Sequence, residues 1–385
     1  MTVLTNAVKS EFLECCNQIT IGRLHLRTPD GEIYDFGSSG PKADMHIRDW
    51  SVVTAMAARG DVGMGETYVA GLWETSSIET LITVALRNLN TFTNFANPSR
   101  LNQLKFLIID RILRINSVRG ASKNIQSHYD VGNEFYQLWL DPSMTYSSAL
   151  FAGTETDLER GQLNKYDRVL NRLSSGERVL EVGCGWGGFA ERAADQGRHV
   201  TGLTISPSQK GYAEARLDGR ADIQLLDYRK STGLFDNIVS IEMIEAVGER
   251  YWPSYFSTLK SRLAEGGRAV VQAITVQDSY FDLYRKGSDY IRQYTFPGGM
   301  LLSDAVISDQ ARQAGLTVKD NFAFGQDYAQ TCRIWAERIR SETAKIHELG
   351  YGQAFLRNWL FYLEICAASF AVGHTDVVQV ELAHA

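Results

Sequence analysis

From residue 178 to residue 274, short apolar runs alternate with stretches of helical periodicity, which restricts the chain to few folds. The apolar runs lie at residues 178–182, 199–205, 223–226, 237–241 and 268–274. Strands that alternate with helices pair in parallel, with helices on both faces of the sheet. Two further strand candidates, 316–322 and 376–382, enclose a helical segment from about residue 327 to residue 371. We therefore predict an α/β fold: a doubly wound sheet with a helical insertion before its last strand. The insertion is expected to cover the carboxyl edge, where such sheets bind ligands.

The N-terminal part of the chain has a different pattern. Residues 1–115 contain strand-like runs at 21–26 and 31–36, followed by helical periodicity, and they carry no glycine-rich loop. We predict a small mixed accessory domain over residues 1–115 that contacts lipid or a membrane. Residues 116–385 are predicted to form the catalytic domain.

Residues 98–124 are basic and amphipathic within an acidic chain. Six basic residues, among them Arg111 and Arg114, accompany the acid Asp110, a local balance of 6 - 1 = +5. A helix of this kind can lie on an anionic lipid surface with its apolar side buried. It can equally be an interdomain helix whose apolar residues are core, because amphipathicity does not identify what the apolar face contacts.

Charge and cysteine content exclude several classes of protein. The 39 Lys and Arg residues against 45 Asp and Glu give a net charge of -6, so no global field attracts nucleic acid. The five cysteines form no CxxC pair and no Cys/His cluster with zinc spacing. The amino terminus lacks the apolar core of a signal peptide, and no stretch reaches the roughly 18 apolar residues that span a bilayer. We expect a reduced, cytoplasmic, metal-free protein that meets a membrane only from its surface.

A glycine loop between a strand and a helix is the clearest ligand-binding motif. In the run VLEVGCGWGGF at residues 179–189, Gly183, Gly185 and Gly187 let a ligand approach the backbone beside a helix amino terminus. The run also matches the dinucleotide pattern GxGxxG, but the acid that would bind a ribose about 20 residues later is absent. Instead, Glu181 precedes the first glycine. This gives the E-x-G-x-G-x-G loop of class I methyltransferases, where the acid lies near the methionine part of S-adenosylmethionine. A tight turn without a ligand is the alternative.

Asp227 and Tyr228 follow the third strand of the predicted sheet, where such folds hold the adenine. A carboxylate accepts a hydrogen bond from the exocyclic amine, and an aromatic ring can stack on the base.

Several motifs occur together in the order typical of one enzyme family. They are HYDVGN at 128–133, LDP at 140–142, MTYS at 144–147, VGCGWGG at 182–188, GLTIS at 202–206, SIEMIEAVG at 240–248, FPGG at 296–299, and FG at 324–325 with DY at 327–328. On these motifs the chain resembles the cyclopropane fatty acid synthase family, including its mycolic acid branch, from about residue 122 onward. The resemblance implies the Rossmann-like class I methyltransferase fold and S-adenosylmethionine as cofactor.

The resemblance also assigns site residues. Those expected to line the cofactor site are Tyr146, Ser147, Glu181, Gly183, Gly185, Gly187, Thr204, Gln209, Asp227 and Tyr228. Glu245 and Tyr328 match family residues that surround a bound bicarbonate, which is thought to act as the base.

This sequence departs from the family pattern at the bicarbonate site. Ser148 replaces a cysteine, while Ala246 and Gln272 each replace a histidine. Glu242 is an additional acid where the family usually has glycine. Ser148 and Gln272 can still donate hydrogen bonds to an anion, but a lost histidine and an added carboxylate make the pocket less favourable for bicarbonate. Bicarbonate therefore stays open as a cofactor.

Methyl transfer from a sulfonium to a cis alkene produces a carbocation, so the pocket has to be dry and electron-rich. Aromatic faces can stabilise the cation, although most aromatic residues here fit a packing role equally well. Tyr146 and Tyr294 adjoin the family motifs. Glu245 is the first candidate for the base and Glu242 the second, because burial in an apolar cleft raises the pKa of a carboxyl group. Glu242 can instead form an ion pair with a basic residue.

We therefore predict an S-adenosylmethionine-dependent C-methyltransferase, acting at the inner membrane surface. It transfers a one-carbon unit to the cis double bond of an unsaturated acyl chain in a phospholipid. The altered bicarbonate site favours a methyl- or methylene-branched product. The alternatives are a cyclopropane-forming synthase and a methyltransferase for a small-molecule acceptor. A nicotinamide oxidoreductase and a non-catalytic lipid carrier agree less well with the loop. No nucleic acid partner is expected, and a homodimer stays open.

Overall fold

The computed structural model describes residues 3–92, 131–153 and 156–385. Its contacts divide the chain into two compact units. The first comprises Met1–Ile112, Lys286–Thr295 and Cys332–His374, and the second Leu113–Arg285, Phe296–Thr331 and Thr375–Ala385. The first unit thus includes two segments from the part of the chain that the sequence assigns to catalysis. The boundary at residue 115 and the lipid-contacting role of the first domain stay predictions. The basic segment 98–124 falls largely in the stretch outside the described residues.

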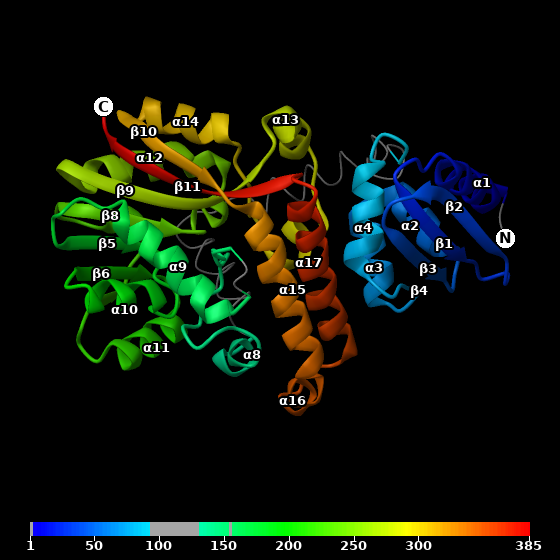
Figure 1. Cartoon of the computed structure of the whole chain (residues 1–385), viewed down its shortest axis with the longest axis horizontal. Coiled ribbons are helices and arrows are strands. Elements are labelled where there is room, and N and C mark those ends of the chain that lie inside the picture. The colour runs from blue at the N-terminus through cyan, green and yellow to red at the C-terminus, as the bar shows by residue number, and fades with distance from the viewer. Residues whose placement is uncertain (1–2, 93–130, 154–155) are drawn as a thin grey trace. The chain divides into compact units, whose positions relative to one another are not determined.

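A seven-stranded sheet forms the centre of the second unit (Figure 1). Its strands are β5 (Arg178–Val182), β6 (His199–Thr204), β7 (Asp222–Leu225), β8 (Phe235–Ile241), β9 (Leu263–Val276), β10 (Leu316–Ala323) and β11 (Thr375–His384). They lie in the order β10-β11-β9-β8-β5-β6-β7. β11 is antiparallel to β9 and β10, whereas β7, β6, β5, β8 and β9 pair in parallel. The predicted α/β fold is confirmed, and each strand predicted for this sheet has a counterpart.

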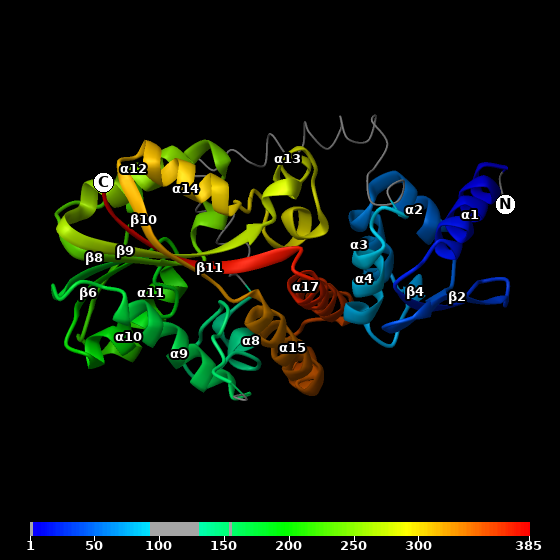
Figure 2. The same ribbon diagram turned by 45° about the horizontal axis from the view of Figure 1, so that its top comes forward.

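Helices cover both faces of this sheet (Figures 1 and 2). The helices are α8 (Asn133–Gln137), α9 (Leu158–Asn171), α10 (Gly188–Asp195), α11 (Pro207–Leu217), α12 (Trp252–Arg262), α13 (Asp278–Lys286) and α14 (Asp304–Gln313). One hydrophobic core joins the sheet to α9, α10 and α11. Another joins it to α12 and α14. Because both faces are covered, inner strands such as β5 are almost continuously apolar, as parallel strands require.

The strand order places a crevice at the carboxyl edge of β5. The chain leaves β5 for β6 on one side, and β8 pairs with the other side of β5. Open α/β sheets bind ligands where the strand order reverses in this way. Local signals then start the helices at this edge. For α11, the Ser206 hydroxyl accepts a hydrogen bond from Gln209 N at 3.3 Å, and Pro207 occupies the first turn.

The first unit contains a four-stranded sheet in the order β2-β1-β3-β4. Its strands are β1 (Gly22–Arg27), β2 (Ile33–Ser39), β3 (Lys42–Ile47) and β4 (Trp73–Glu74), and its early helices are α1 (Val3–Asn17), α2 (Ser51–Arg59), α3 (Asp61–Val69) and α4 (Ile78–Arg87). The two strands predicted here correspond to β1 and β2. The sequence reasoning missed α1 and β3.

The predicted insertion before the last strand is helical but not continuous. It forms α15 (Gly325–Ser341), α16 (Thr343–Glu348) and α17 (Gln353–Ala371). Within the first unit, α17 packs against α3 and α4. Glu364 of α17 accepts a hydrogen bond from Glu79 N at 3.1 Å, and Phe361 packs against Trp73. The predicted placement of the insertion over the sheet edge stays a prediction. Among the described helices, none has the length and apolar character needed to cross a bilayer.

Candidate active site

The glycine loop after β5 has the open backbone that a ligand needs. Gly183, Gly185 and Gly187 have φ angles of +85°, +52° and +86°, which favour glycine. Gly183 N and Cys184 N both donate hydrogen bonds to Leu203 O, at 3.0 and 2.9 Å, and so fix the loop to β6. A Cβ built on Gly185 would meet nothing within 4 Å. The loop therefore leaves room for a ligand at Gly185.

Glu181 ends in an unsatisfied buried acceptor beside this loop. The residue is 3% exposed, and Oε2 has no hydrogen-bond partner within the described part of the chain. Burial raises the pKa of Glu181 to about 8, against the opposing effect of the Lys165 charge. A buried oxygen without a donor is unfavourable, so an ammonium group at this position would be stabilised. The loop and this acid together fit the amino-acid end of S-adenosylmethionine.

Thr204 and Gln209 lie together at the end of β6. The Thr204 hydroxyl donates to Gln209 Oε1 at 2.8 Å and accepts from Ser206 N at 3.1 Å. Both side chains are buried, so their orientations are fixed by the strand and by the start of α11.

Asp227 and Tyr228 are placed differently from the sequence-based expectation. The Asp227 carboxylate accepts hydrogen bonds from Arg229, at 2.8 Å from Nε and 2.6 Å from Nη2. Burial would raise the pKa of Asp227, but these bonds outweigh it and lower the pKa. The Tyr228 ring packs edge-on against Tyr255 with centroids 5.7 Å apart, within the core of the second unit. Adenine binding by this pair stays a prediction.

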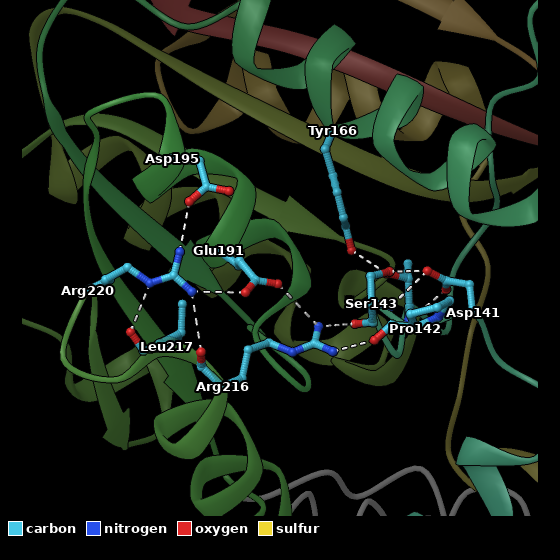
Figure 3. A network of polar contacts seen from close by, with 10 residues as sticks. Asp141, Pro142, Ser143, Tyr166, Glu191, Asp195, Arg216, Leu217 and Arg220 are labelled. Atoms are coloured by element: carbon cyan, nitrogen blue, oxygen red, sulfur yellow. Dashed lines mark hydrogen bonds and ion pairs between the residues drawn. The ribbon is translucent and has the colours of Figure 1, made fainter.

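The loop before the predicted site residues 146–148 is held by a polar network (Figure 3). Asp141, 2% exposed, accepts hydrogen bonds from Ser143 N at 2.9 Å and from Thr145 N at 3.3 Å. The Tyr166 hydroxyl of α9 lies 2.6 Å from Thr145 Oγ1. Arg216 of α11 donates to the carbonyl oxygens of Pro142 and Ser143, as Figure 3 shows. Helices from two places in the sequence therefore fix this loop.

A buried lysine, which the sequence analysis missed, contacts the same loop. Lys165 of α9 has no exposed surface, and its Nζ donates to Ser147 Oγ at 2.6 Å. One turn earlier, Gln162 Nε2 donates to Ser147 O at 2.9 Å. The spacing of three residues between Gln162 and Lys165 was the available signal, because it places both on one helix face.

Glu242 is the point at which the predicted catalytic residues converge. Its Oε1 accepts hydrogen bonds from Ser148 N at 2.9 Å and from Gln272 Nε2 at 2.7 Å. Its Oε2 accepts from the Tyr328 hydroxyl at 2.6 Å. Burial raises the pKa of Glu242, and these donors together with Lys165 oppose that rise. The donor set thus surrounds a carboxylate that belongs to the chain itself.

The backbone of Glu242 has a φ angle of +48°. This conformation favours glycine, and a residue with a Cβ pays about 1 kcal/mol or more to adopt it. The sequence shows the same point, since Glu242 stands where the family usually has glycine. The hydrogen bonds to its carboxylate offset this backbone strain.

Gln272 is oriented by a chain of buried amides. Gln379 Nε2 donates to Gln272 Oε1 at 2.9 Å, and Arg168 Nη1 donates to Gln379 Oε1 at 2.8 Å. Because its oxygen is already bonded, the Gln272 amide must present its NH₂ group to Glu242.

Glu245 lies near Glu242 but is bonded differently. Its Oε1 accepts one hydrogen bond, from Ile274 N at 2.5 Å, while Oε2 is buried with no partner among the described residues. Burial and the negative charge of Glu242 raise the pKa of Glu245 to about 8. Near neutral pH, Glu245 is therefore mainly a neutral acid.

Comparison with known proteins agrees with this geometry. The family model of the mycolic acid cyclopropane synthetases matches residues 116–380. The chain belongs to this family. It is 34% identical over 365 residues to the tuberculostearic acid methyltransferase UfaA1 of Mycobacterium tuberculosis, covering 89% of this chain and 84% of the relative. It is 30% identical over 344 residues to the cyclopropane-fatty-acyl-phospholipid synthase of Escherichia coli K12, covering 88% and 87%.

Solved structures of family members have the same fold as the second unit's sheet and helices. The cyclopropane synthase MmaA2 of Mycobacterium tuberculosis has a TM-score of 0.64 at 28% identity, covering 68% of this chain and 98% of that one. The mycolic acid cyclopropane synthase CmaA1, complexed with S-adenosylhomocysteine (SAH), has a TM-score of 0.63 at 28% identity, covering 68% and 97%. This family member is therefore an S-adenosylmethionine-dependent methyltransferase, which confirms the predicted enzyme class and cofactor.

Aromatic rings surround the predicted cofactor residue Tyr146. Its ring lies 5.7 Å from Tyr136, 5.4 Å from Trp139 and 6.4 Å from Phe296, measured between centroids. This cluster can supply the electron-rich faces expected near a developing cation. Tyr294 lies in the first unit, where its hydroxyl bonds to Glu66.

Replacement of Gly185 tests the glycine loop. We expect Gly185→Val to abolish SAH binding in calorimetry, because the side chain would occupy the open space beside the loop. Gly197→Val is the matched control, since Gly197 also has a positive φ, +79°, and open space around its Cβ position. Both variants should lose similar stability, but only the first should lose binding. Retained SAH affinity in folded Gly185→Val would refute the loop assignment.

Glu245 makes the stability of the protein depend on pH. Its pKa is about 8 in the fold, and near 4.5 when unperturbed. Between these values the folded state binds more protons than the unfolded state, so stability falls as pH rises from about 4.5 to 8. Glu245→Gln removes this effect, so its unfolding free energy should exceed that of the wild type by about 2 kcal/mol more at pH 9 than at pH 5.

Thermal unfolding across this pH range measures the difference. Glu265→Gln, a change at an exposed position of β9, is the control and should leave the pH profile unchanged. Parallel profiles of Glu245→Gln and the wild type would contradict the raised pKa.

Proposed function

We propose that this enzyme transfers a one-carbon unit from S-adenosylmethionine to the cis double bond of an unsaturated acyl chain in a phospholipid. We further propose that the product is a methyl- or methylene-branched chain. The observation that carries this proposal is the Glu242 carboxylate, held by Ser148 N, Gln272 and Tyr328. These are the groups that the family resemblance associates with a bound bicarbonate.

The two carboxyl groups have different protonation states near neutral pH. Two nearby buried carboxylates repel, so the pair favours a single negative charge. Three donors favour the charge on Glu242, whereas Glu245 accepts one hydrogen bond and its pKa is raised to about 8. Glu242 is then the proton acceptor and Glu245 the neutral neighbour. This assignment reverses the order that the sequence suggested.

The cofactor supplies an electrophilic methyl group on its sulfonium. Transfer of that methyl to the alkene leaves a carbocation on the acyl chain, and the base decides the product by the proton that it removes. Loss of a proton from the new methyl, with closure on the neighbouring carbon, gives a cyclopropane. After a hydride shift, loss from the methyl gives a methylene branch, and loss from the chain gives a methyl-branched alkene.

Glu242 differs from a diffusible anion because its position is tied to the backbone between β8 and the short helix at Ile244–Ala246. A carboxylate fixed in this way removes a proton from one direction only. The donors that would bind bicarbonate are already bonded to Glu242, so the reaction needs no added bicarbonate.

The names of the relatives support a lipid acceptor. The relative with 34% identity is a tuberculostearic acid methyltransferase, and the Escherichia coli relative is a cyclopropane-fatty-acyl-phospholipid synthase. A cyclopropane-forming synthase is therefore the second candidate for this chain. Action at a membrane surface, the cytoplasmic location, a homodimer and a small-molecule acceptor all stay at the level of predictions.

The product can be identified directly. We expect lipids treated with the enzyme to gain a methyl or methylene branch, at a rate that does not change with added bicarbonate. Proton NMR before and after mild hydrogenation separates the products, because ring and methylene both add one CH₂ and have the same mass. A saturated product with high-field cyclopropyl protons, formed faster with bicarbonate, would return the chain to the ring-forming synthases.

Substitution of the two carboxyl groups tests the base. We expect Glu242→Gln to lower kcat by about 10² to 10⁴-fold, because an amide cannot accept the proton. Glu245→Gln should lower kcat by about tenfold at most, since Glu245 is mainly neutral near pH 7. SAH affinity should change little in either variant. A larger loss in Glu245→Gln than in Glu242→Gln would make Glu245 the base.

Glu242→Gly is a second test that does not depend on the amide. Glycine adopts the positive φ of position 242 without strain and leaves Ser148 N, Gln272 and Tyr328 unbonded. Added bicarbonate should then restore part of the activity. No recovery would count against an exchange of roles between Glu242 and an anion.

A further inference from the structure

Lys165 is a fully buried lysine with no role in the function proposed above. It lies on α9, has no exposed surface and has its ammonium 4.5 Å from the centroid of the Tyr166 ring. Burial lowers the pKa of Lys165 to about 7, while the negative charges of Glu242, Asp141 and Glu181 oppose that change. Buried lysines are rare because desolvation of the charge is unfavourable. Its presence beside three acids therefore calls for a specific partner.

The direct partner of Lys165 is the hydroxyl of Ser147, at 2.6 Å from Nζ. An ammonium only donates, so the hydroxyl oxygen accepts this bond and its own proton remains available for another acceptor. Gln162 holds the same residue through its carbonyl oxygen at 2.9 Å, which fixes Ser147 against α9. The pair therefore presents a hydroxyl donor that a nearby positive charge strengthens.

The position of this donor relative to the glycine loop identifies its ligand. Lys165 interacts electrostatically with Glu181, which ends β5 just before the loop and has an enclosed oxygen without a partner in the described chain. One buried acid and one buried cation thus lie at the same end of the crevice. An α-amino acid end carries the matching charges, an ammonium and a carboxylate.

We propose that Lys165 is a positioning residue that recognises the α-carboxylate of the cofactor's methionine part through the Ser147 hydroxyl. In this arrangement Glu181 receives the α-ammonium, so the two buried charges bind the two ends of the zwitterion. Lys165 does not touch the reacting atoms, and it acts on cofactor binding instead of proton removal. The inference rests on the cofactor of the family and is independent of the acceptor lipid and the product.

The test compares two ligands that differ only in the carboxylate. Calorimetry measures the affinities for SAH and for its decarboxylated analogue. We expect Lys165→Met to weaken SAH binding by about tenfold or more, the usual loss for a charge-assisted hydrogen bond, and to change binding of the analogue less than about twofold. Lys260→Met, a change at an exposed lysine of α12, is the control and should affect neither ligand.

A second variant separates the proposed role from a structural one. Ser147→Ala keeps Lys165 and makes a small change, so it tests the relay even if Lys165→Met fails to fold. It should also weaken SAH selectively, and the double variant should lose little more than either single variant, because both remove the same interaction.

The outcomes decide between the alternatives. Equal losses for SAH and the analogue would overturn the proposal, since a general disturbance of the loop would affect both. Unchanged SAH affinity in both variants would also overturn it and leave Lys165 as the counter-charge of Glu242. Binding of SAH by the wild-type protein verifies the cofactor site separately, so failure of the carboxylate proposal is distinguishable from failure of the cofactor assignment.

Discussion

Burial of charge at the carboxyl edge of the sheet is the constraint on which the site depends. Glu181, Glu242, Glu245 and Lys165 all have ionisable groups enclosed there. An isolated buried charge is strongly destabilising, so each group must be neutral, hydrogen-bonded or paired. Glu242 is stabilised by three donors, and Glu181 and Glu245 by raised pKa values. A ligand that brings complementary charge is bound because it satisfies what the fold leaves unsatisfied.

The geometry of these charges is fixed from elsewhere in the second unit. Gln272 faces Glu242 because Gln379 of β11 bonds its oxygen, and Arg168 of α9 bonds Gln379 in turn. The antiparallel strand β11 and the helix α9 therefore take part in orienting the proton acceptor. The loop before Ser147 is likewise held by Arg216 and Tyr166, from two different helices. A group that must remove one particular proton needs this degree of preorganisation.

A base that belongs to the chain has a consequence for evolution within the family. One substitution, a carboxylate at a position with φ +48°, places an anion among donors that otherwise bind a free one. The nearby histidines are then no longer required to attract an anion, which is consistent with Ala246 and Gln272 in their places. Change of product therefore needs little change of fold, because the cofactor half of the site is untouched.

The sequence by itself determined the α/β sheet, the glycine loop and the family, because hydrophobic periodicity and contiguous motifs are local signals. It also brought Ser148, Gln272, Tyr328 and Glu242 to attention as separate residues. Only the tertiary structure decided that the first three donate to the fourth, since these positions are far apart in the chain and meet only at the sheet edge. Lys165 and the packing of α17 against α4 were decided in the same way. Burial and the choice of partner are properties of the packed chain, so the pKa of each carboxyl group, and with it the choice of base, follows from the fold and not from the motif.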